Sequence, residues 1–328
     1  MKHACRVFSR LVLVAGALTL TTAPAASASS LFVDATVYGV KCDGSADDTT
    51  AINNAISAAP NGSIVTLPAS SSPCITSGAI FIPNTKRVNL LGGGTQLQYS
   101  GSGNAIGILD MELGNVNPAP WVKGISITCT NSSNGYGIHI RNSLNILIED
   151  VQIHGCRTGI YLHNTNAITG GGYTEQTVLR SVDIYNCGYG IYLDPDTGAA
   201  SFANTTFESV RVDTMANSSL STPYGIYVAA GAAPYRSSYL AVLVIPDKNG
   251  AVGLYTAGDM SGDFGNINFE VPNPTVINAT GIVFQSGFKT AGLTIQSHFA
   301  GFGSNGNQQV NALGGTQIPS GWILISGF

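Results

Sequence analysis

Two rows of side chains that can bind sugars or move protons recur at fixed places in this sequence. The phrase G-I-H-I at 137–140 returns as G-I-Y-L at 159–162 and 190–193, and as G-I-Y-V at 225–228. Alternate residues of an extended strand share a face, so the aliphatic residues are expected to point inward. The outward row is then His139, Tyr161, Tyr192 and Tyr227, and the row two residues further along is Arg141, His163, Asp194 and Ala229.

This set of groups suits the cleavage of a sugar chain by β-elimination beside a uronic acid. The reaction needs a cation to neutralise the uronate, a base to remove the C5 proton and an acid for the leaving oxygen. We expect Arg141 to neutralise the uronate, His163 or Tyr161 to act as the base and Tyr192 as the acid, with Asp194 in the same catalytic set. His139 and Tyr227 are expected to contact the substrate. The first hypothesis is therefore a polysaccharide lyase.

A glycoside hydrolase is the first alternative, because it needs two carboxylates roughly 5 to 10 Å apart. Asp194 could pair with Asp196 in Y-L-D-P-D-T-G or with Glu175, and both partners are otherwise expected to bind substrate. No cofactor is expected, although Asp194 and Asp196 with main-chain oxygens leave a Ca²⁺ ion as an open alternative. The second alternative is a non-catalytic polysaccharide-binding or surface protein, in which the tyrosine row is a stacking platform or an ordinary cross-strand ladder.

The spacing of a second phrase predicts how these strands are arranged. I-S-I at 125–127 returns as V-Q-I at 151–153, V-D-I at 182–184 and V-R-V at 210–212, with spacings of 26, 31 and 28 residues and no helical periodicity between them. Such a repeat indicates an all-β fold, a right-handed parallel β-helix in which each repeat is one coil. Stacking the coils also places one column of alternating charge on another face, expected to be structural: Lys123, Glu149, Arg180 and Glu208.

Residues 36–68 carry a different signal, an acidic turn followed by an amphipathic segment. Ala51, Ile52, Ala55 and Ile56 lie at helical spacing behind an N-cap at Asp48 or Thr49. The order Y-G-V-K-C-D-G-S-A-D-D-T-T-A-I-N-N-A-I resembles the opening of the pectate lyase superfamily, the rhamnogalacturonase and epimerase-like β-helix proteins, except that Cys42 stands where glycine is usual.

The resemblance implies a short N-terminal helix that caps the first coil, with Asp47 and Asp48 structural rather than catalytic. It also implies a carbohydrate-active protein, since lyases, hydrolases, epimerases and phage tailspike depolymerases share this opening. The assembly would be a monomer or, as in tailspikes, a homotrimer. The ordered motifs of polygalacturonases are absent, and "GYGIYLDPDTG" at 188–198 lacks the histidine of the epimerase element, so an epimerase is the third reading.

Cysteine usage suggests an oxidising compartment. Cys42 with Cys74 is the preferred disulfide, tying the cap to the first coil. Cys156 and Cys187 align on neighbouring coils and would form either a disulfide or a buried thiol ladder. Cys129 is then expected to be the odd thiol.

The first residues predict export. Lys2, Arg6 and Arg10 precede the apolar run 11–20, and Ala26-Ser27-Ala28 fits the cleavage rule, so 1–28 is predicted to be a signal peptide. The mature chain would be one β-helix domain over 29–328, with the cap and first coil at 29–80 and a terminal cap or tail at 301–328. Ten apolar residues are too few to span a bilayer. A secreted or periplasmic location without membrane attachment follows.

The charge of the chain limits the classes of partner that it can bind. The chain has 14 Lys+Arg against 18 Asp+Glu, and cleavage would lower the formal charge from −4 to −7 by removing three cations. Only 10% of the residues are charged, which excludes a disordered chain or a coiled coil. No basic cluster exists beyond the first ten residues, so nucleic acid is excluded as a partner. The expected partner is a polysaccharide.

Overall fold

A computed structural model describes residues 31–111, 119–166, 172–196, 201–214, 220–285, 293–313 and 324–326. The predicted signal peptide lies outside these ranges. Within them, no helix has the length and apolar character needed to cross a membrane.

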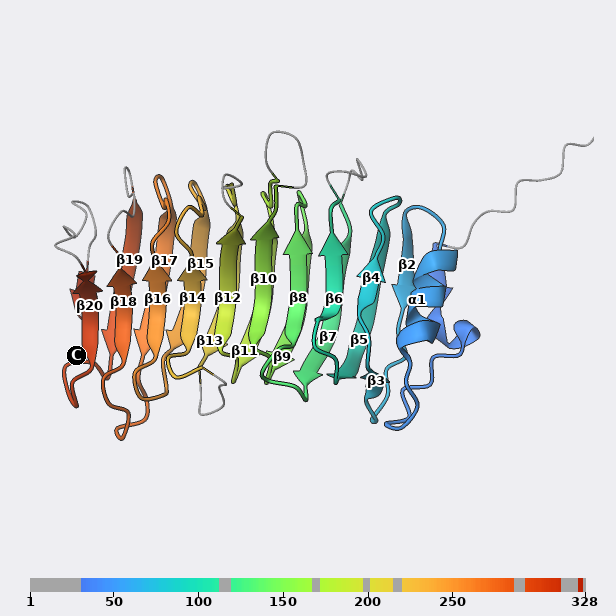
Figure 1. Cartoon of the computed structure of the whole chain (residues 1–328), viewed down its shortest axis with the longest axis horizontal. Helices are drawn as coiled ribbons and strands as arrows, with labels where there is room; N and C mark the ends of the chain where they lie inside the picture. Colours follow the sequence, from blue (N-terminus) through green and yellow to red (C-terminus); the bar gives the residue numbers. More distant parts are fainter. Residues whose placement is uncertain are drawn as a thin grey trace, which may run out of the picture.

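The described chain forms a right-handed parallel β-helix of about nine turns (Figure 1). One sheet, named here the front sheet, has nine strands within the described ranges: β4 (Ile80–Ile82), β6 (Asn104–Leu109), β8 (Tyr136–Arg141), β10 (Thr158–Asn164), β12 (Tyr189–Pro195), β14 (Tyr224–Val228), β16 (Val252–Thr256), β18 (Thr280–Phe284) and β20 (Gln308–Ala312). Its strands lie side by side in chain order from β4 to β20.

The other sheet, named here the back sheet, has twelve strands in the described residues: β1 (Phe32–Asp34), β2 (Ser63–Thr66), β3 (Cys74–Thr76), β5 (Val88–Tyr99), β7 (Trp121–Cys129), β9 (Leu147–His154), β11 (Val178–Tyr185), β13 (Thr206–Asp213), β15 (Ser238–Ile245), β17 (Phe264–Glu270), β19 (Thr294–Ala300) and β21 (Leu324–Ser326). The phrases V-Q-I and V-D-I lie in this sheet, and the phrase G-I-Y-L lies in the front sheet. From β4 onward, each coil contributes one strand to each sheet.

The expected inward ladders are confirmed by the register. Ile160 pairs with Ile138 and Ile191 in the front sheet, and Val182 pairs with Val151 and Val210 in the back sheet. These side chains have at most 1% of their surface exposed. The core is a stack of aliphatic layers repeated once per coil.

A short helix caps the first coil, as the sequence indicates. Helix α1 (Thr49–Ala58) buries Ile52 and Ile56 against the end of the solenoid, after the 3-10 turn η1 (Ala35–Tyr38). The carboxylate of Asp48 accepts hydrogen bonds from the backbone N–H groups of Lys41 and Cys42, at 2.8 and 3.0 Å. Asp48 thus holds the turn before the helix, which is a structural role.

The cysteine pairing differs in part from the sequence-based expectation. Cys42 and Cys74 form the preferred disulfide. The expectation that Cys129 stays unpaired is wrong, because Cys129 forms a disulfide with Cys156 and the buried Cys187 is the free thiol. Cys129 ends β7 and Cys156 lies in the turn after β9, where Gly155 has a φ of 70°. The alignment of Cys156 with Cys187 on the following coil therefore does not decide the pairing.

Two further features concern the back sheet and the C-terminal end. The charge column is confirmed: Glu149 forms ion pairs with Lys123 and Arg180, and Arg180 reaches Glu208 at 2.7 Å. Part of 301–328, expected to be a cap or tail, instead extends the two sheets as β20 and β21.

Candidate active site at the carboxyl ends of the front sheet

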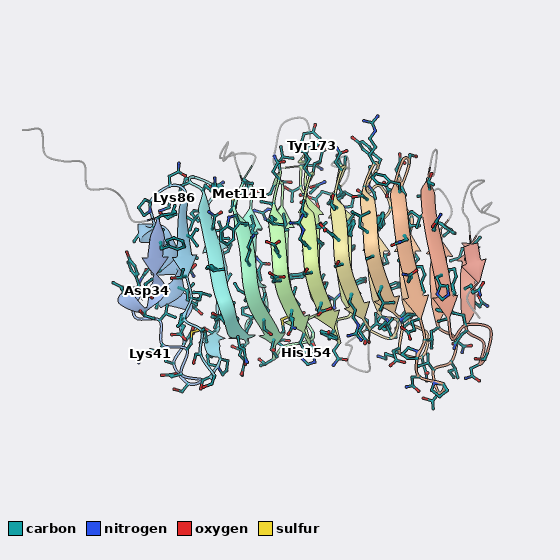
Figure 2. All side chains as sticks on the ribbon, turned by 180° about the vertical axis from the view of Figure 1, so that it is seen from behind. Asp34, Lys41, Lys86, Met111, His154 and Tyr173 are labelled. Carbon is teal, nitrogen blue, oxygen red and sulfur yellow. A yellow bond between two sulfur atoms is a disulfide. The ribbon has the colours of Figure 1, made fainter. Side chains whose placement is uncertain are left out.

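The predicted site residues come together where three front-sheet strands end. His163 in β10 pairs with Arg141 in β8 and with Asp194 in β12. Tyr161 pairs in the same way with His139 and Tyr192. In Figure 2, Met111 and Tyr173, from the segments that follow β6 and β10, lie at one edge of the solenoid, and His154 lies at the opposite edge.

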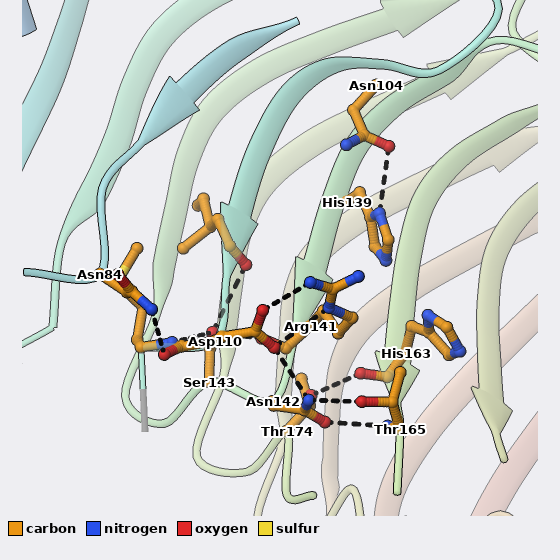
Figure 3. Close-up of polar contacts among 12 residues, drawn as sticks. Asn84, Asn104, Asp110, His139, Arg141, Asn142, Ser143, His163, Thr165 and Thr174 are labelled. Atoms are coloured by element: carbon orange, nitrogen blue, oxygen red, sulfur yellow. Dashed lines mark hydrogen bonds and ion pairs between the residues drawn. The ribbon is translucent and has the colours of Figure 1, made fainter. Parts of the chain in front are cut away.

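Arg141 is not free to meet a substrate carboxylate alone, because Asp110 already binds it. The guanidinium donates from Nε to Oδ1 of Asp110 at 3.1 Å and from Nη2 to Oδ2 at 2.5 Å (Figure 3). Asn142 donates to the same Oδ1 at 2.9 Å and to Thr165 at 2.7 Å. Such a two-point ion pair fixes the guanidinium in place and balances its charge.

His139 lies beneath this network and is held without charge. Only 8% of its surface is exposed, and its Nδ1 lies 3.0 Å from Oδ1 of Asn104. Burial, with the nearby His163 and Arg141 adding to the effect, lowers the pKa of His139 to about 3. Its Nε2 is buried without a hydrogen-bond partner. His139 therefore does not offer a charge to a substrate at neutral pH.

Asp194 is held by a tyrosine of the neighbouring strand. Its Oδ2 accepts a hydrogen bond from the hydroxyl of Tyr161 at 2.6 Å. Burial raises the pKa of Tyr161 well above its usual value, and the hydrogen bond to Asp194 raises it further. Burial and then the charge of Asp194 also raise the pKa of Tyr192. Because Tyr161 keeps its proton, the expectation that it acts as a base is not favoured, whereas its hydroxyl can orient Asp194.

Asp196 is the second carboxylate on the same strand end. The backbone N–H of Asp196 donates to the carbonyl of Asn164 at 2.8 Å, so the pairing with β10 continues past the end of β12. Its Oδ1 lies 3.5 Å from Nε2 of His163, and about half of the Asp196 side chain is exposed, against 18% of His163. Asp194 and Asp196 thus both face β10. Asp194 contacts Tyr161 and Asp196 contacts His163, and these two partners are themselves two positions apart in β10.

Charge at these strand ends is net negative. The carboxylates of Asp110, Asp194 and Asp196 meet one guanidinium, that of Arg141, and one imidazole that can be charged, that of His163. Even with His163 protonated, three negative charges face two positive ones. Such a field disfavours an anionic substrate.

The tyrosine row continues as a ladder of rings beyond the carboxylates. Tyr161 stacks on Tyr136 with centroids 4.9 Å apart, and Tyr227 stacks on Tyr255 at 4.6 Å. Tyr192 lies between, 5.4 Å from Tyr161 and 5.0 Å from Tyr227. Rings packed on one another have those faces occupied, so the row is first a cross-strand ladder that stiffens the sheet.

Glu175 is positioned by a different set of contacts. Its carboxylate accepts a hydrogen bond from the hydroxyl of Ser201, and its backbone bridges to Leu144. Tyr235 lies within 3.4 Å of the same hydroxyl. The contacts that hold Asp194 are those with Tyr161 and β10, so Asp196 rather than Glu175 shares its environment.

Sequence reasoning missed the polar partners of the site, above all Asp110, Asn104 and Asn142. A signal was present: N-A-I-G-I-L-D at 104–110 is one more copy of the repeated phrase, with Ala105 in place of its glycine. The register pairs Leu109 with Arg141 and Asn104 with Tyr136. Aligning this copy would have placed Asp110 beside the Arg141 strand end.

Several solved structures are similar to this chain. A protein named Geobacillus virus E2 ORF18 matches with 14% identity and a TM-score of 0.49, over 86% of this chain and 60% of that one. The Agl-KA catalytic domain matches with 16% identity and a TM-score of 0.55, over 88% of this chain and 55% of that one. An alginate lyase from Paenibacillus sp. str. FPU-7 has 13% identity and a TM-score of 0.44, over 86% and 99% of the two chains. The chain therefore spans somewhat more than half the length of the first two.

No family model and no curated protein matches the sequence. The fold is nevertheless the right-handed parallel β-helix of the pectate lyase type. Among proteins of similar structure are lyases, hydrolases and an epimerase that act on polysaccharides, all at low identity. At this identity the likeness concerns the fold alone.

Proposed function

We propose that this protein is a secreted glycoside hydrolase that cleaves a neutral polysaccharide with Asp194 and Asp196. The observation that carries the proposal is that both carboxylates face β10, Asp194 at Tyr161 and Asp196 at His163. Residues two apart in an extended strand are about 6.6 Å apart along the chain, which lies within the separation of roughly 6.5 to 9.5 Å typical of inverting hydrolases.

The two carboxylates have different surroundings and so different roles. Asp194 is oriented by the Tyr161 hydroxyl and would activate the attacking water. Asp196 is more exposed, so it would take up a proton from solvent and donate it to the glycosidic oxygen. Arg141 with Asp110 would position the strand ends rather than neutralise a substrate charge. The two disulfides fit an oxidising compartment such as the one that a signal peptide implies.

A neutral substrate follows from the charge of the site. Three carboxylates surround the strand ends, and the one guanidinium is already paired. A uronate would meet net repulsion there, whereas the hydroxyl groups of a neutral sugar would find carboxylate acceptors.

A uronate-specific lyase is the second candidate, favoured by one observation. The rings of His163 and Tyr161 are stacked with centroids 5.0 Å apart and the Nδ1 atom of His163 is buried without a partner, so a base and a phenolic acid lie side by side. In that case Arg141 would have to exchange Asp110 for the substrate carboxylate.

The deciding experiment is an assay of the purified mature protein on neutral and uronic-acid polysaccharides. New reducing ends without ultraviolet absorbance of an unsaturated product would identify a hydrolase, and such absorbance would identify a lyase. In a hydrolase, Asp194→Asn and Asp196→Asn should each lower kcat by about 10²- to 10⁴-fold, the usual worth of a general acid or base. Glu175→Gln is the matched control and should retain most activity. Full activity in both aspartate variants would refute the assignment.

A further inference from the structure

A depression on the back sheet lies away from the front-sheet strand ends. It has a volume of about 580 Å³ and lies over β5, β7, β9 and β11, on the sheet turned toward the viewer in Figure 2. This volume is within the range of saccharide-sized and drug-sized ligand sites.

Three of these strands, β7, β9 and β11, share a left-handed residue at the depression. Gly124, Asp150 and Ser181 have φ angles of 66°, 52° and 51°, and each is skipped in the register between paired residues on either side. The residues before and after them pair normally, as Glu149 does with Arg180 and Val151 with Val182. Because the left-handed residues stack from coil to coil, the sheet is bent along a line and the depression runs along that line.

One end of the depression is closed by glycine backbone. The register between β5 and β7 shifts where Gly92, Gly93 and Gly94 oppose Gly124 alone. A Cβ atom on Gly124 would lie 3.1 Å from the backbone nitrogen of Gly93. The glycines at this end of the depression have no side chains, so the space that side chains would otherwise fill stays open.

The residues that line the depression carry hydrogen-bond donors and acceptors, and none of them is a cation. Gln96, Ser126, Gln152 and Asp183 form one continuous row across the four strands. Asp150 and Ser181 stand beside this row, both exposed. Of the neighbouring cations, Lys123 and Arg180 pair with Glu149, and Arg211, which lies opposite Asp183 in the register, pairs with Asp213. Two amides, two hydroxyls and two carboxylates can therefore donate to and accept from one ligand.

This composition selects a class of ligand. Two carboxylates, with the neighbouring Lys123, Arg180 and Arg211 each already paired, disfavour a polyanion. Sugar hydroxyls both donate and accept, and the mixed amide and carboxylate row suits them.

We infer that the depression is a second saccharide-binding site, which holds a neutral polysaccharide on the back sheet while the front sheet acts on it. The choice of a polysaccharide as ligand rests on the proposed function, whereas the location rests on the depression itself. The site would raise the local concentration of substrate at the enzyme without taking part in the reaction.

The test measures binding separately from cleavage. All proteins carry Asp194→Asn so that cleavage cannot remove the ligand, and affinity electrophoresis is run in gels containing α-glucan, β-1,3-glucan, xylan or galactomannan. Gln152→Ala/Asp183→Ala should weaken binding of at least one polymer by about 30-fold, since two lost hydrogen bonds of about 1 kcal/mol each total about 2 kcal/mol. Ser126→Trp, which fills the depression, should do the same. Asn268→Ala, further along the same outward row, should not.

The outcomes separate this inference from the proposed function. Binding that is retained in both depression variants, or absent for every polymer with the unaltered depression, overturns the inference whatever the enzyme cleaves. Binding abolished by EDTA and restored by Ca²⁺ would also overturn it in favour of a cation site. Binding that is lost in the depression variants, while the protein with an intact Asp194 cleaves none of the polymers, would support the inference and refute the proposed hydrolase.

Discussion

At the scale of single residues, the hydrogen bond from Tyr161 to Asp194 makes the sharpest prediction. Tyr161→Phe removes the hydroxyl that orients the carboxylate at 2.6 Å but keeps the ring in the ladder. Loss of a hydrogen bond to a charged group should lower kcat by about tenfold or more, with little change in KM or in the melting temperature. Steady-state kinetics check this, with Tyr255→Phe in the same row as control. Equal effects of the two variants would contradict a specific role for Tyr161.

A buried aspartate outside the site should govern how stability depends on pH. Burial raises the pKa of Asp263 to about 8, although Ser237 N–H donates to its Oδ1 at 2.9 Å and Tyr239 lies 3.3 Å from its Oδ2. In the unfolded chain the pKa would return to about 3.9. Between these values the folded chain holds a proton that the unfolded chain releases, so this stabilisation is complete below about pH 4 and is lost as the pH rises to 8.

Asp263→Asn should flatten that dependence, since the amide keeps the acceptor for Ser237 and donates to Tyr239. We expect the variant to exceed the parent in unfolding free energy by about 1–3 kcal/mol at pH 8 and to match it near pH 4. Thermal unfolding followed from pH 4 to 9 measures the difference. Asp150→Asn, exposed on β9, serves as control. Parallel curves for parent and Asp263→Asn would show that Asp263 does not set the slope.

At the scale of elements, the first glycine of each repeated phrase allows the strands and the opposite sheet to pack closely, because it has no side chain. A Cβ atom on Gly137, Gly159, Gly190, Gly225 or Gly253 would lie 2.5 to 2.7 Å from the carbonyl oxygen of the next glycine in the ladder. At Gly190 it would also overlap Cγ1 of Val212 from the back sheet. The glycine is therefore needed because the opposite sheet packs directly against it, and not because a turn requires it.

Gly190→Ala should consequently destabilise the fold by about 1–3 kcal/mol or more, the usual effect of overpacking a filled core. Denaturant unfolding gives the change in free energy. Gly103→Ala is the control, because the nearest atom to its Cβ would be the Tyr99 hydroxyl at an ordinary 3.6 Å. Similar losses at both positions would indicate a general effect of glycine replacement rather than the ladder.

The sequence was sufficient for the elements and less so for the site. Alternation of apolar residues and the recurring glycine determine the register, so His163 was correctly placed between Arg141 and Asp194. The ion pairing of Arg141 could not be predicted in the same way. It depends on Asp110, which lies in a coil whose copy of the repeated phrase has Ala105 in place of the glycine. Spacing alone did not reveal the partner of Cys156, because Cys129 and Cys187 belong to the two coils on either side of it.

At the scale of the molecule, covalent bridging is confined to the first coils. The disulfides join Cys42 to Cys74 and Cys129 to Cys156, and no cysteine follows Cys187 in the chain. Because each coil of a solenoid contacts its neighbours only, stabilisation by a bridge is largely local. Coils after β12 rely on packing and hydrogen bonding.

Reduction should therefore increase hydrogen exchange in the early coils much more than in the late ones. Each closed loop of about 30 residues should contribute about 2–4 kcal/mol. Exchange followed by mass spectrometry, with and without reductant, should show loss of protection over β2 to β9 and little change over β14 to β18. The Cys187→Ser protein controls for thiol chemistry at the free cysteine. A uniform loss of protection along the chain would mean that the coils unfold together.

The glycine ladder also bears on how such a chain can change in length over evolution. Because each coil presents the same backbone edge to the next, a whole coil can be added or removed while the register of the others is kept. The proposed chemistry occupies only β8 to β12, so additions beyond β16 would lengthen the molecule without moving a reacting group. Descendants and relatives should accordingly differ by multiples of one coil at the C-terminal end, and be constant in coil number from β6 to β12.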